Sequence, residues 1–122
     1  MEIQDEAKLL RIFISSTDKL KHTPLYEVIV FAAKRNGIAG ATVIKGFMGY
    51  GSSSIINTQK FWEFTEKVPV IIEIVDTAEK IDSFIEKITP YFDNLPKGGL
   101  ITVEKAMIVL HKSGKKKNSF LS

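Results

Sequence analysis

The sequence predicts an α+β fold in which a four-stranded antiparallel sheet carries two helices on one face. Four short runs rich in Val, Ile, Phe and Thr lie near residues 7–15, 40–48, 68–75 and 100–110, as expected for strands. Two segments with apolar residues at helical spacing follow the first and the third run, so the order is β-α-β-β-α-β. Right-handed crossovers then place both helices on the same side of the sheet. This order of elements is the ferredoxin-like plan. The length of 122 residues allows one such domain, because it is too short for two separate cores.

The first strand is predicted at residues 7–15, since AKLLRIFIS is a short and largely apolar run. Thr23 and Pro24 predict the start of the first helix, with the hydroxyl as cap and the proline at the first helical position. Gly37 provides a left-handed stop at its end. The apolar positions of this helix are Leu25, Val28, Ile29, Ala32 and Ala33.

The second strand is predicted at 40–48 and the third at 68–75, joined by a glycine-rich loop at about 49–67. Asp76 and Glu79 have the spacing of a capping box and are expected to open the second helix. Pro90 predicts a break or kink near its end. Its apolar stripe comprises Ala78, Ile81, Ile85, Ile88 and Phe92, flanked by Phe84.

The last apolar stretch predicts two short strands or one strand with a bulge. Residues 100–103 alternate in one phase, and Ala106, Ile108 and Leu110 alternate in the other. The third and last strands are apolar on both sides, so a sheet with one bare face would expose a large hydrophobic patch. We therefore expect self-association through the open face, closed by cyclic symmetry, with the number of subunits left open.

Charge is concentrated at the C-terminus. Lys112 and three lysines at 115–117 lie in the last eleven residues; without these four, 13 basic residues remain against 14 acidic ones, a net charge of −1. We expect a domain at 1–114 and a basic, disordered tail at 115–122, with no specific nucleic-acid partner. The absence of cysteine, of a basic signal-like N-terminus and of a long apolar run predicts a cytoplasmic protein that is not embedded in a membrane.

No catalytic or metal-binding constellation stands out. His22 and His111 are the only histidines, and they lack metal-ligand spacing with other residues. The serines at 52–54 lack a nucleophile elbow. We therefore expect no enzyme activity, no catalytic residue and no metal site.

Two glycine segments are candidates for ligand contact. The run at 46–53 (GFMGYGSS) nearly matches a phosphate loop, but Ser52 stands where the lysine is needed. Its glycines could bring backbone N–H groups close to an anion, or could simply form a mobile tip. Gly98 and Gly99 precede the last strand and, taken alone, indicate a turn.

The order of these segments resembles that of PII nitrogen-regulatory proteins. Residues 40–47 (GATVIKGF) are similar to the strand entering their T-loop, and 70–75 (VIIEIV) to the strand leaving it. Residues 98–103 (GGLITV) resemble their B-loop and next strand, and 106–114 (AMIVLHKSG) their last strand and C-terminal loop. The match spans about residues 8–114, and the short loop points to the uncharacterised, short-T-loop branch of PII-like proteins.

The resemblance implies a homotrimer whose sheets face inward and whose intersubunit clefts bind a small effector. The candidate effector that it implies is an adenine nucleotide (AMP, ADP or ATP). It does not imply a definite cofactor. The implied ligand-binding residues are Gly46, Phe47, Gly49, Gly98, Gly99 and Lys112, the last standing where the family uses arginine. Leu100 and Leu110 replace two basic residues of PII proteins, which implies weaker binding, a less charged nucleotide or a different ligand.

The predicted function is that of a PII-like signal-transduction protein, which regulates a partner protein through loop 49–67. The alternative is a ligand-free trimeric adaptor of a membrane transporter. A metal-tolerance protein of the same general fold is a third reading, which the absence of cysteine disfavours.

Overall fold

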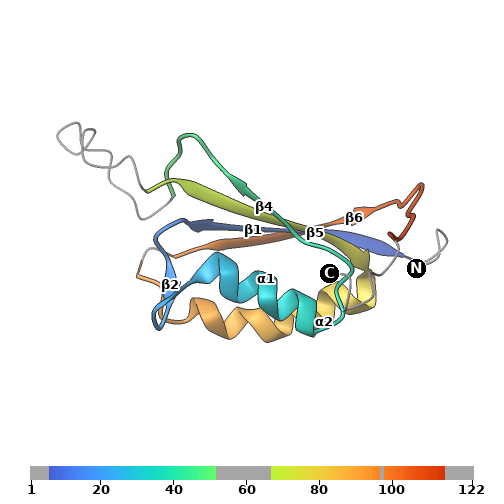
Figure 1. The fold of residues 1–122 in the computed structure, drawn as a ribbon, viewed down its shortest axis with the longest axis horizontal. Helices are drawn as coiled ribbons and strands as arrows, with labels where there is room; N and C mark the ends of the chain where they lie inside the picture. Colours follow the sequence, from blue (N-terminus) through green and yellow to red (C-terminus); the bar gives the residue numbers. More distant parts are fainter. Residues whose placement is uncertain (1–5, 52–66, 97, 115–122) are drawn as a thin grey trace, which may run out of the picture.

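A computed structural model describes residues 6–51, 67–96 and 98–114 (Figure 1). The elements are β1 (Ala7–Ser15), β2 (Lys19–Leu20), β3 (Thr23–Pro24), α1 (Leu25–Arg35), β4 (Thr42–Lys45), β5 (Pro69–Thr77), α2 (Ala78–Ile88), the 3-10 helix η2 (Thr89–Phe92) and β6 (Leu100–Ala106). Strands β2 and β3 form a small separate hairpin between β1 and α1.

The main sheet has the order β4-β5-β1-β6, and every neighbouring pair is antiparallel. Helices α1 and α2 both lie below the sheet in Figure 1, and no helix covers its upper face among the described residues. This is the predicted ferredoxin-like βαββαβ arrangement, and the predicted fold class is confirmed. Strand β1 is central, which explains why its sequence is apolar along nearly its whole length.

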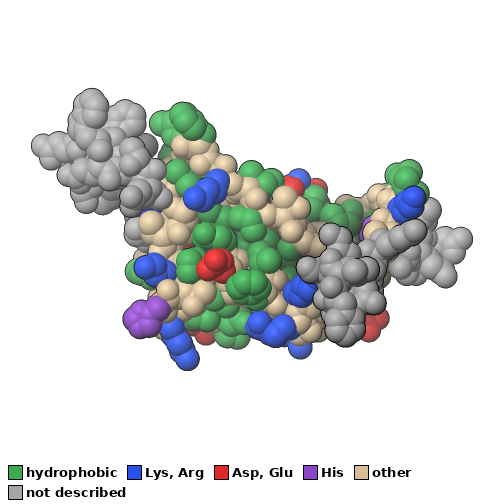
Figure 2. All heavy atoms as spheres, viewed as in Figure 1, with side chains coloured by type: hydrophobic (Ala, Val, Ile, Leu, Met, Phe, Trp, Pro, Cys, Tyr) green, Lys and Arg blue, Asp and Glu red, His purple; other side chains and the backbone are tan. Residues whose placement is uncertain are grey.

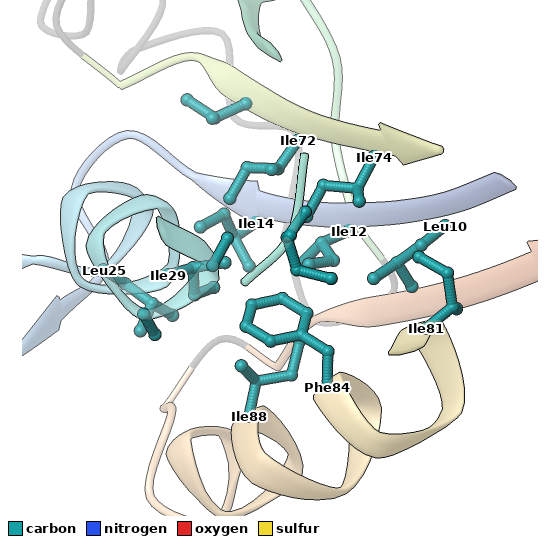
Figure 3. Packing of buried hydrophobic residues seen from close by; sticks show 14 residues of the cluster. Leu10, Ile12, Ile14, Leu25, Ile29, Ile72, Ile74, Ile81, Phe84 and Ile88 are labelled. Atoms are coloured by element: carbon teal, nitrogen blue, oxygen red, sulfur yellow. The ribbon is translucent and has the colours of Figure 1, made fainter. Parts of the chain in front are cut away.

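The core lies between the sheet and the two helices (Figure 3). Alternate residues of β1 and β5 point down into it, and α2 presents Phe84 and two isoleucines to them. The largest fully buried hydrophobic side chains are Leu10, Ile12, Leu25, Ile29, Val70, Ile72, Ile74, Ile81, Phe84 and Ile88. Phe84 lies at the centre of the α2 stripe, and Ile85, predicted as a stripe residue, is only partly buried at its side.

The start of α1 differs from the prediction. Pro24, with φ −53° and ψ 133°, is the N-cap, and no side chain caps the helix. Thr23 and Pro24 instead pair with β2. The backbone N–H of Leu25 donates to the carbonyl oxygen of Asp18 at 2.8 Å, so a distant carbonyl satisfies one of the first helical donors.

The start of α2 also differs. Thr77 is the N-cap, and its hydroxyl accepts a hydrogen bond from the N–H of Lys80 at 3.3 Å. Asp76, the predicted cap, belongs to β5 and is only 2% exposed. Its Oδ2 accepts from the N–H of Ala39 at 2.8 Å and its Oδ1 from the N–H of Thr77 at 2.7 Å. Asp76 therefore fastens the segment before β4 to the end of β5.

Several boundaries are also corrected. β4 covers 42–45 rather than 40–48, and β5 covers 69–77 rather than 68–75. The last apolar stretch forms one strand, which ends at Ala106, and the described residues 107–114 contain no strand. The break at Pro90 is confirmed, since α2 gives way to η2 there. Most of the predicted loop 49–67, and the predicted tail 115–122, lie outside the described residues, so the division into domain and tail stays a prediction.

The open face of the sheet is mainly apolar, with one group of charges in its middle. Its exposed or half-buried hydrophobic residues are Leu9, Phe13, Ile44, Ile71, Val75 and Leu100. Arg11 lies among them and bridges Glu73 on β5 (Nε–Oε2 2.9 Å) and Glu104 on β6 (Nη1–Oε1 2.6 Å). Hydrophobic side chains also gather over α1 and the neighbouring part of the sheet in the view of Figure 2. Among the exposed residues of α1 is Phe31, at 58% exposure.

Candidate ligand site

Gly46 and Gly49 pack against the first residue of β5. The N–H of Gly46 donates to the carbonyl oxygen of Pro69 at 2.7 Å. A Cβ atom added to Gly46 would come within 2.6 Å of Pro69 Cγ, and one added to Gly49 within 3.1 Å. Close packing against Pro69 therefore favours glycine at both positions, and most strictly at Gly46. Phe47, between them, is 97% exposed.

Gly98 and Gly99 lead into β6 at the same end of the sheet. Gly98 has φ +69°, a left-handed conformation that favours glycine, and its N–H donates to the carbonyl oxygen of Leu95 at 3.3 Å. A Cβ added to Gly99 would come within 2.5 Å of Phe92 Cε2 and 3.4 Å of the carbonyl oxygen of Phe13. Gly99 thus lets η2 and the end of β1 approach each other.

The register of the sheet brings the two glycine groups to the same end of the sheet, one beside β5 and the other beside β6. Ser15, the last residue of β1, pairs with Pro69, and Phe13 pairs with Leu100. Gly46 and Gly49 lie beside Pro69, and Gly98 and Gly99 immediately precede Leu100. Five of the six predicted ligand residues, the four glycines and Phe47, therefore share what we call the glycine end of the sheet, at the left of Figure 1.

Lys112 lies away from the glycine end. β6 runs antiparallel to β1 and finishes opposite Ala7, so the chain after Ala106 continues at the other end of the sheet. In Figure 1 this C-terminal segment, coloured red, lies at the right. The exposed Lys112 follows His111 in it. One subunit therefore does not bring Lys112 to the glycines.

The C-terminal segment instead borders a groove of about 810 Å³. The sheet contributes Leu9, Thr42, Glu73 and Val75 to this groove, and the segment before β4 contributes residues 39–41. Residues 107–111 form the opposite wall, where Met107, Val109 and Leu110 are largely exposed. The groove is open and combines an apolar lining with the carboxylate of Glu73, the hydroxyl of Thr42 and the imidazole of His111.

Glu73 is shared between the groove and the charge group of the open face. It accepts a hydrogen bond from Arg11, and this bond is the main cause that raises the pKa of Arg11 above its ordinary value. Glu104 acts in the same direction, and desolvation acts against it. Arg11 on β1 binds the carboxylates of both Glu73 and Glu104. This contact orients the side chain of Glu73 at the groove.

Residues 7–108 match the family DUF190, described as "Uncharacterized ACR, COG1993". The chain belongs to this family. A UPF0166 protein of Aquifex aeolicus is 36% identical to this DUF190 chain over 102 residues, which are 84% of this chain and 92% of that protein. The UPF0166 protein MJ1524 of Methanocaldococcus jannaschii is 36% identical over 98 residues, or 80% and 87% of the two chains.

Several solved structures with the same fold are PII-like proteins. CPII from Thiomonas intermedia, bound to ADP, AMP and acetate, has a TM-score of 0.60 at 16% identity, covering 85% of this chain and 89% of CPII. A putative PII-like signaling protein (TTHA0516) from Thermus thermophilus has a TM-score of 0.60 at 22% identity, covering 86% and 91%. The resemblance to PII-like proteins is thereby confirmed at the level of fold.

The described part of the DUF190 chain contains neither a cluster of metal ligands nor a helix that could span a membrane. In the described ranges, no group of three or more His, Asp and Glu residues could hold a metal ion. Neither α1 nor α2 has the length and apolarity needed to cross a bilayer, and no other helix among the described residues does. His22 and His111 are both exposed.

The residues missed by the sequence analysis are those of the groove: Thr42, Glu73 and Val75. They lie on two strands and meet residues 107–111 only through the fold. A signal was present in Glu73, the one charged residue within the apolar run VPVIIEIV. A carboxylate in such a run indicates a face that is not part of the ordinary core.

Proposed function

We propose that this protein is a cytoplasmic, PII-like regulator that forms a homotrimer and binds a small effector, an adenine nucleotide, at the clefts between subunits. The domain 1–114 would form the trimer, and loop 49–67 would transmit effector binding to a partner protein. Support for the effector comes from the shared fold with CPII, a protein crystallised with ADP and AMP. Support for the partner surface comes from the exposed side chains of Phe47 and Met48, just before that loop, and of Tyr50 at its start.

The observation that carries the proposal is the division of the candidate site between two ends of one sheet. The glycine end holds Gly46, Gly49, Gly98 and Gly99, whereas Lys112 and the groove lie at the other end. A site that uses both sets needs the glycine end of one subunit and the C-terminal segment of another. The open apolar face offers the contact surface for such an assembly.

Two measurements test the proposal directly. Light scattering after size-exclusion chromatography should give a mass of three chains at micromolar concentration. Calorimetry with AMP, ADP, ATP and cyclic AMP should show saturable heat for at least one of them. A monomer refutes the intersubunit cleft, and no heat for any nucleotide refutes the choice of effector.

A subunit-mixing experiment tests the shared cleft. Lys112→Glu removes the cation from one half-site, and Gly98→Asp puts a carboxylate into the other. Asp and Asn tolerate the positive φ of Gly98 better than other non-glycine residues do. Gly98→Asn is therefore a neutral control of the same shape, and Lys34→Glu on the exposed side of α1 is a control for the lysine change.

Each charged variant alone should bind nucleotide about ten- to a hundredfold more weakly, the effect of one charge-assisted contact. Unfolding and remixing the two charged variants should restore normal affinity at roughly one cleft in four, because cyclic mixing creates some clefts with both halves intact. The two control variants should bind like the wild type. If mixing restores nothing while each variant is trimeric, the two half-sites do not meet across an interface.

A further inference from the structure

β4 lies at one edge of the sheet, and its outer side has no neighbouring strand in the described part of the chain. On its inner side, the N–H of Gly46 donates to the carbonyl oxygen of Pro69. Pairs along an antiparallel ladder alternate between bonded and non-bonded, so the residues two and four positions before Gly46 also bond inward. The backbone N–H and C=O groups of Val43 and Lys45 therefore point outward and are open to a further strand.

Residues 107–111 (MIVLH) have the sequence of a strand but do not form one. Their Ile and Val favour extended backbone, and their apolar character predicts a short strand. In the structure β6 ends at Ala106, and no strand follows it among the described residues. Met107, Val109 and Leu110 are 84%, 76% and 79% exposed, so most of their apolar surface faces water. A continuous row of exposed apolar residues indicates an interaction surface.

The edge and the segment do not pair with each other within one subunit. The groove separates residues 107–111 from residues 39–42 at the start of β4. An exposed edge strand is a template for pairing with another chain, and Val43 and Ile44 of β4 are 37% and 41% exposed. The segment has five residues and β4 has four, so their lengths match. A second copy of the chain therefore supplies a strand that fits the edge.

We propose that residues 107–111 of one subunit add as a strand to the outer edge of β4 of the next subunit, through backbone hydrogen bonds to Val43 and Lys45. This contact is β-augmentation between copies of the chain. It is heterologous, because the segment and the edge are different surfaces, and heterologous contacts close into a ring when the rotation allows. The inference rests on the proposed homotrimer and specifies the contact that closes it. It involves neither the glycine end nor an effector.

Engineered cysteine pairs test the contact, because the chain contains no cysteine. Val43 and Val109 lie at the centres of the edge and the segment, so they come opposite each other, within one residue, whichever direction the added strand takes. Opposite Cα atoms of paired strands are about 4.5–5.5 Å apart, which a disulfide can span. Val43→Cys combined with Val109→Cys should therefore give covalent trimers after mild oxidation, seen on a denaturing gel without reductant.

Two sets of variants complete the cross-linking experiment. Val43→Cys combined with Ile108→Cys or with Leu110→Cys covers a shift of one residue in register. Val43→Cys combined with Val103→Cys is the matched control, because Val103 is a 43% exposed valine of β6 that lies outside the segment. The control pair should stay unlinked.

Amide hydrogen exchange, measured by NMR, gives a second readout on the wild-type side chains. The amides of Val43 and Lys45 should exchange slowly in the trimer, as the amide of Ile44 does through its bond to β5. Val109→Asp should remove the protection of Val43 and Lys45 but not that of Ile44. It should also weaken association about tenfold or more, because a carboxylate replaces an apolar side chain that association buries.

The control for this variant is Lys105→Asp, at an exposed position of β6. It changes the charge by more than Val109→Asp does, and it should associate like the wild type. Circular dichroism establishes that both variants are folded, which is expected because Val109 is exposed in the single subunit.

Links between subunits through the segment, together with slow exchange at Val43 and Lys45, support the inference. A homotrimer in which these two amides exchange freely overturns it, leaves the proposed function standing and leaves the edge to a different protein. Links through Val103 overturn it as well, because β6 of a neighbour then occupies the edge. Protected amides without any link through the segment, or links confined to one chain, overturn the choice of a second copy's segment.

The inference and the proposed function can also fail separately in the other direction. Linked dimers, or an open series of linked chains, support the added strand and refute the homotrimer. A folded monomer with freely exchanging amides at Val43 and Lys45 refutes both.

Discussion

Substitution of Asp76 by Asn tests how the segment that borders the groove is held. The carboxylate of Asp76 is buried, and each of its oxygens accepts one backbone N–H, from Ala39 and from Thr77. Asparagine has nearly the same shape but only one acceptor oxygen, and its NH2 group would face the other N–H. One of the two backbone donors then loses its partner at a side chain that is only 2% exposed.

The expected cost follows from these two contacts. A hydrogen bond to a charged group contributes about 1.5–3 kcal/mol, and an unsatisfied buried donor costs about 1–3 kcal/mol. Because both figures describe the same N–H, they are not added, and we expect Asp76→Asn to lower the free energy of unfolding by about 1.5–3 kcal/mol. Ala39 leads directly into the groove residues, so the groove should also lose its fixed shape.

The assay is urea denaturation at one protein concentration, with Asp82→Asn as the matched control. Asp82 is an exposed residue of α2 whose Oδ1 lies 2.8 Å from Lys8 Nζ, and loss of such a surface pair costs about 0–1 kcal/mol. Keeping the concentration fixed makes the concentration-dependent contribution of subunit association the same for all variants. A difference between the two variants below about 0.5 kcal/mol would show that Asp76 does not anchor Ala39 as described.

Two further substitutions test the core and the helix cap by the same denaturation assay. Phe84→Ala should destabilise the protein by about 3–5 kcal/mol, because Phe84 is 1% exposed. Phe31→Ala, at an exposed position of α1, is the control and should change stability by less than about 1 kcal/mol. Equal effects of the two substitutions would contradict the placement of Phe84 in the core. Thr77→Ala should lower the free energy of unfolding by about 1 kcal/mol, because it removes the hydroxyl that accepts from the N–H of Lys80. Thr77→Ser keeps a hydroxyl and should be as stable as the wild type. If serine is no more stable than alanine, the hydroxyl does not cap α2.

The sequence was sufficient for the fold because each element carries its own signal. β1 is a continuous apolar run between polar segments, and its predicted bounds of 7–15 agree with the structure. The stripe of α2 at helical spacing predicted a buried face, and Pro90 predicted where the helix breaks. Such patterns need only neighbours along the chain, and the order of elements then leaves few topologies to choose from.

The local errors have a common physical cause, which is that a backbone donor can be satisfied from far away in sequence. Thr23 was predicted to cap α1 by its proximity, but Asp18 reaches Leu25 through the β2–β3 hairpin. Asp76 has the spacing of a cap, but it bonds to Ala39, 37 residues away. Thr77, next to it, takes the capping role. Residue propensities alone do not predict these hydrogen-bond partners at the starts of α1 and α2.

The groove was missed for a related reason. Its lining comes from β1, from the start of β4, from β5 and from the segment after β6. These residues do not have the sequence spacing of any known ligand-binding motif. Glu73 is oriented by Arg11 on the neighbouring strand, a contact that only the fold creates. The glycines, in contrast, were noticed because they cluster in sequence, although the structure gives Gly46 and Gly99 packing roles that do not require a ligand.

The direction of β6 explains why a ligand site built from both glycines and Lys112 has to be shared. β6 begins beside Gly99 and runs seven residues along β1, a rise of about 23 Å, before the segment with Lys112 begins. The described residues 107–114 do not form a strand that returns along the sheet. Extended chain in one direction cannot bring its two ends together, so a site that uses both sets needs its other half from a second copy of the chain. Loss of nucleotide binding on dilution to monomers, at a concentration where the monomer stays folded, is therefore the behaviour that an intersubunit site requires.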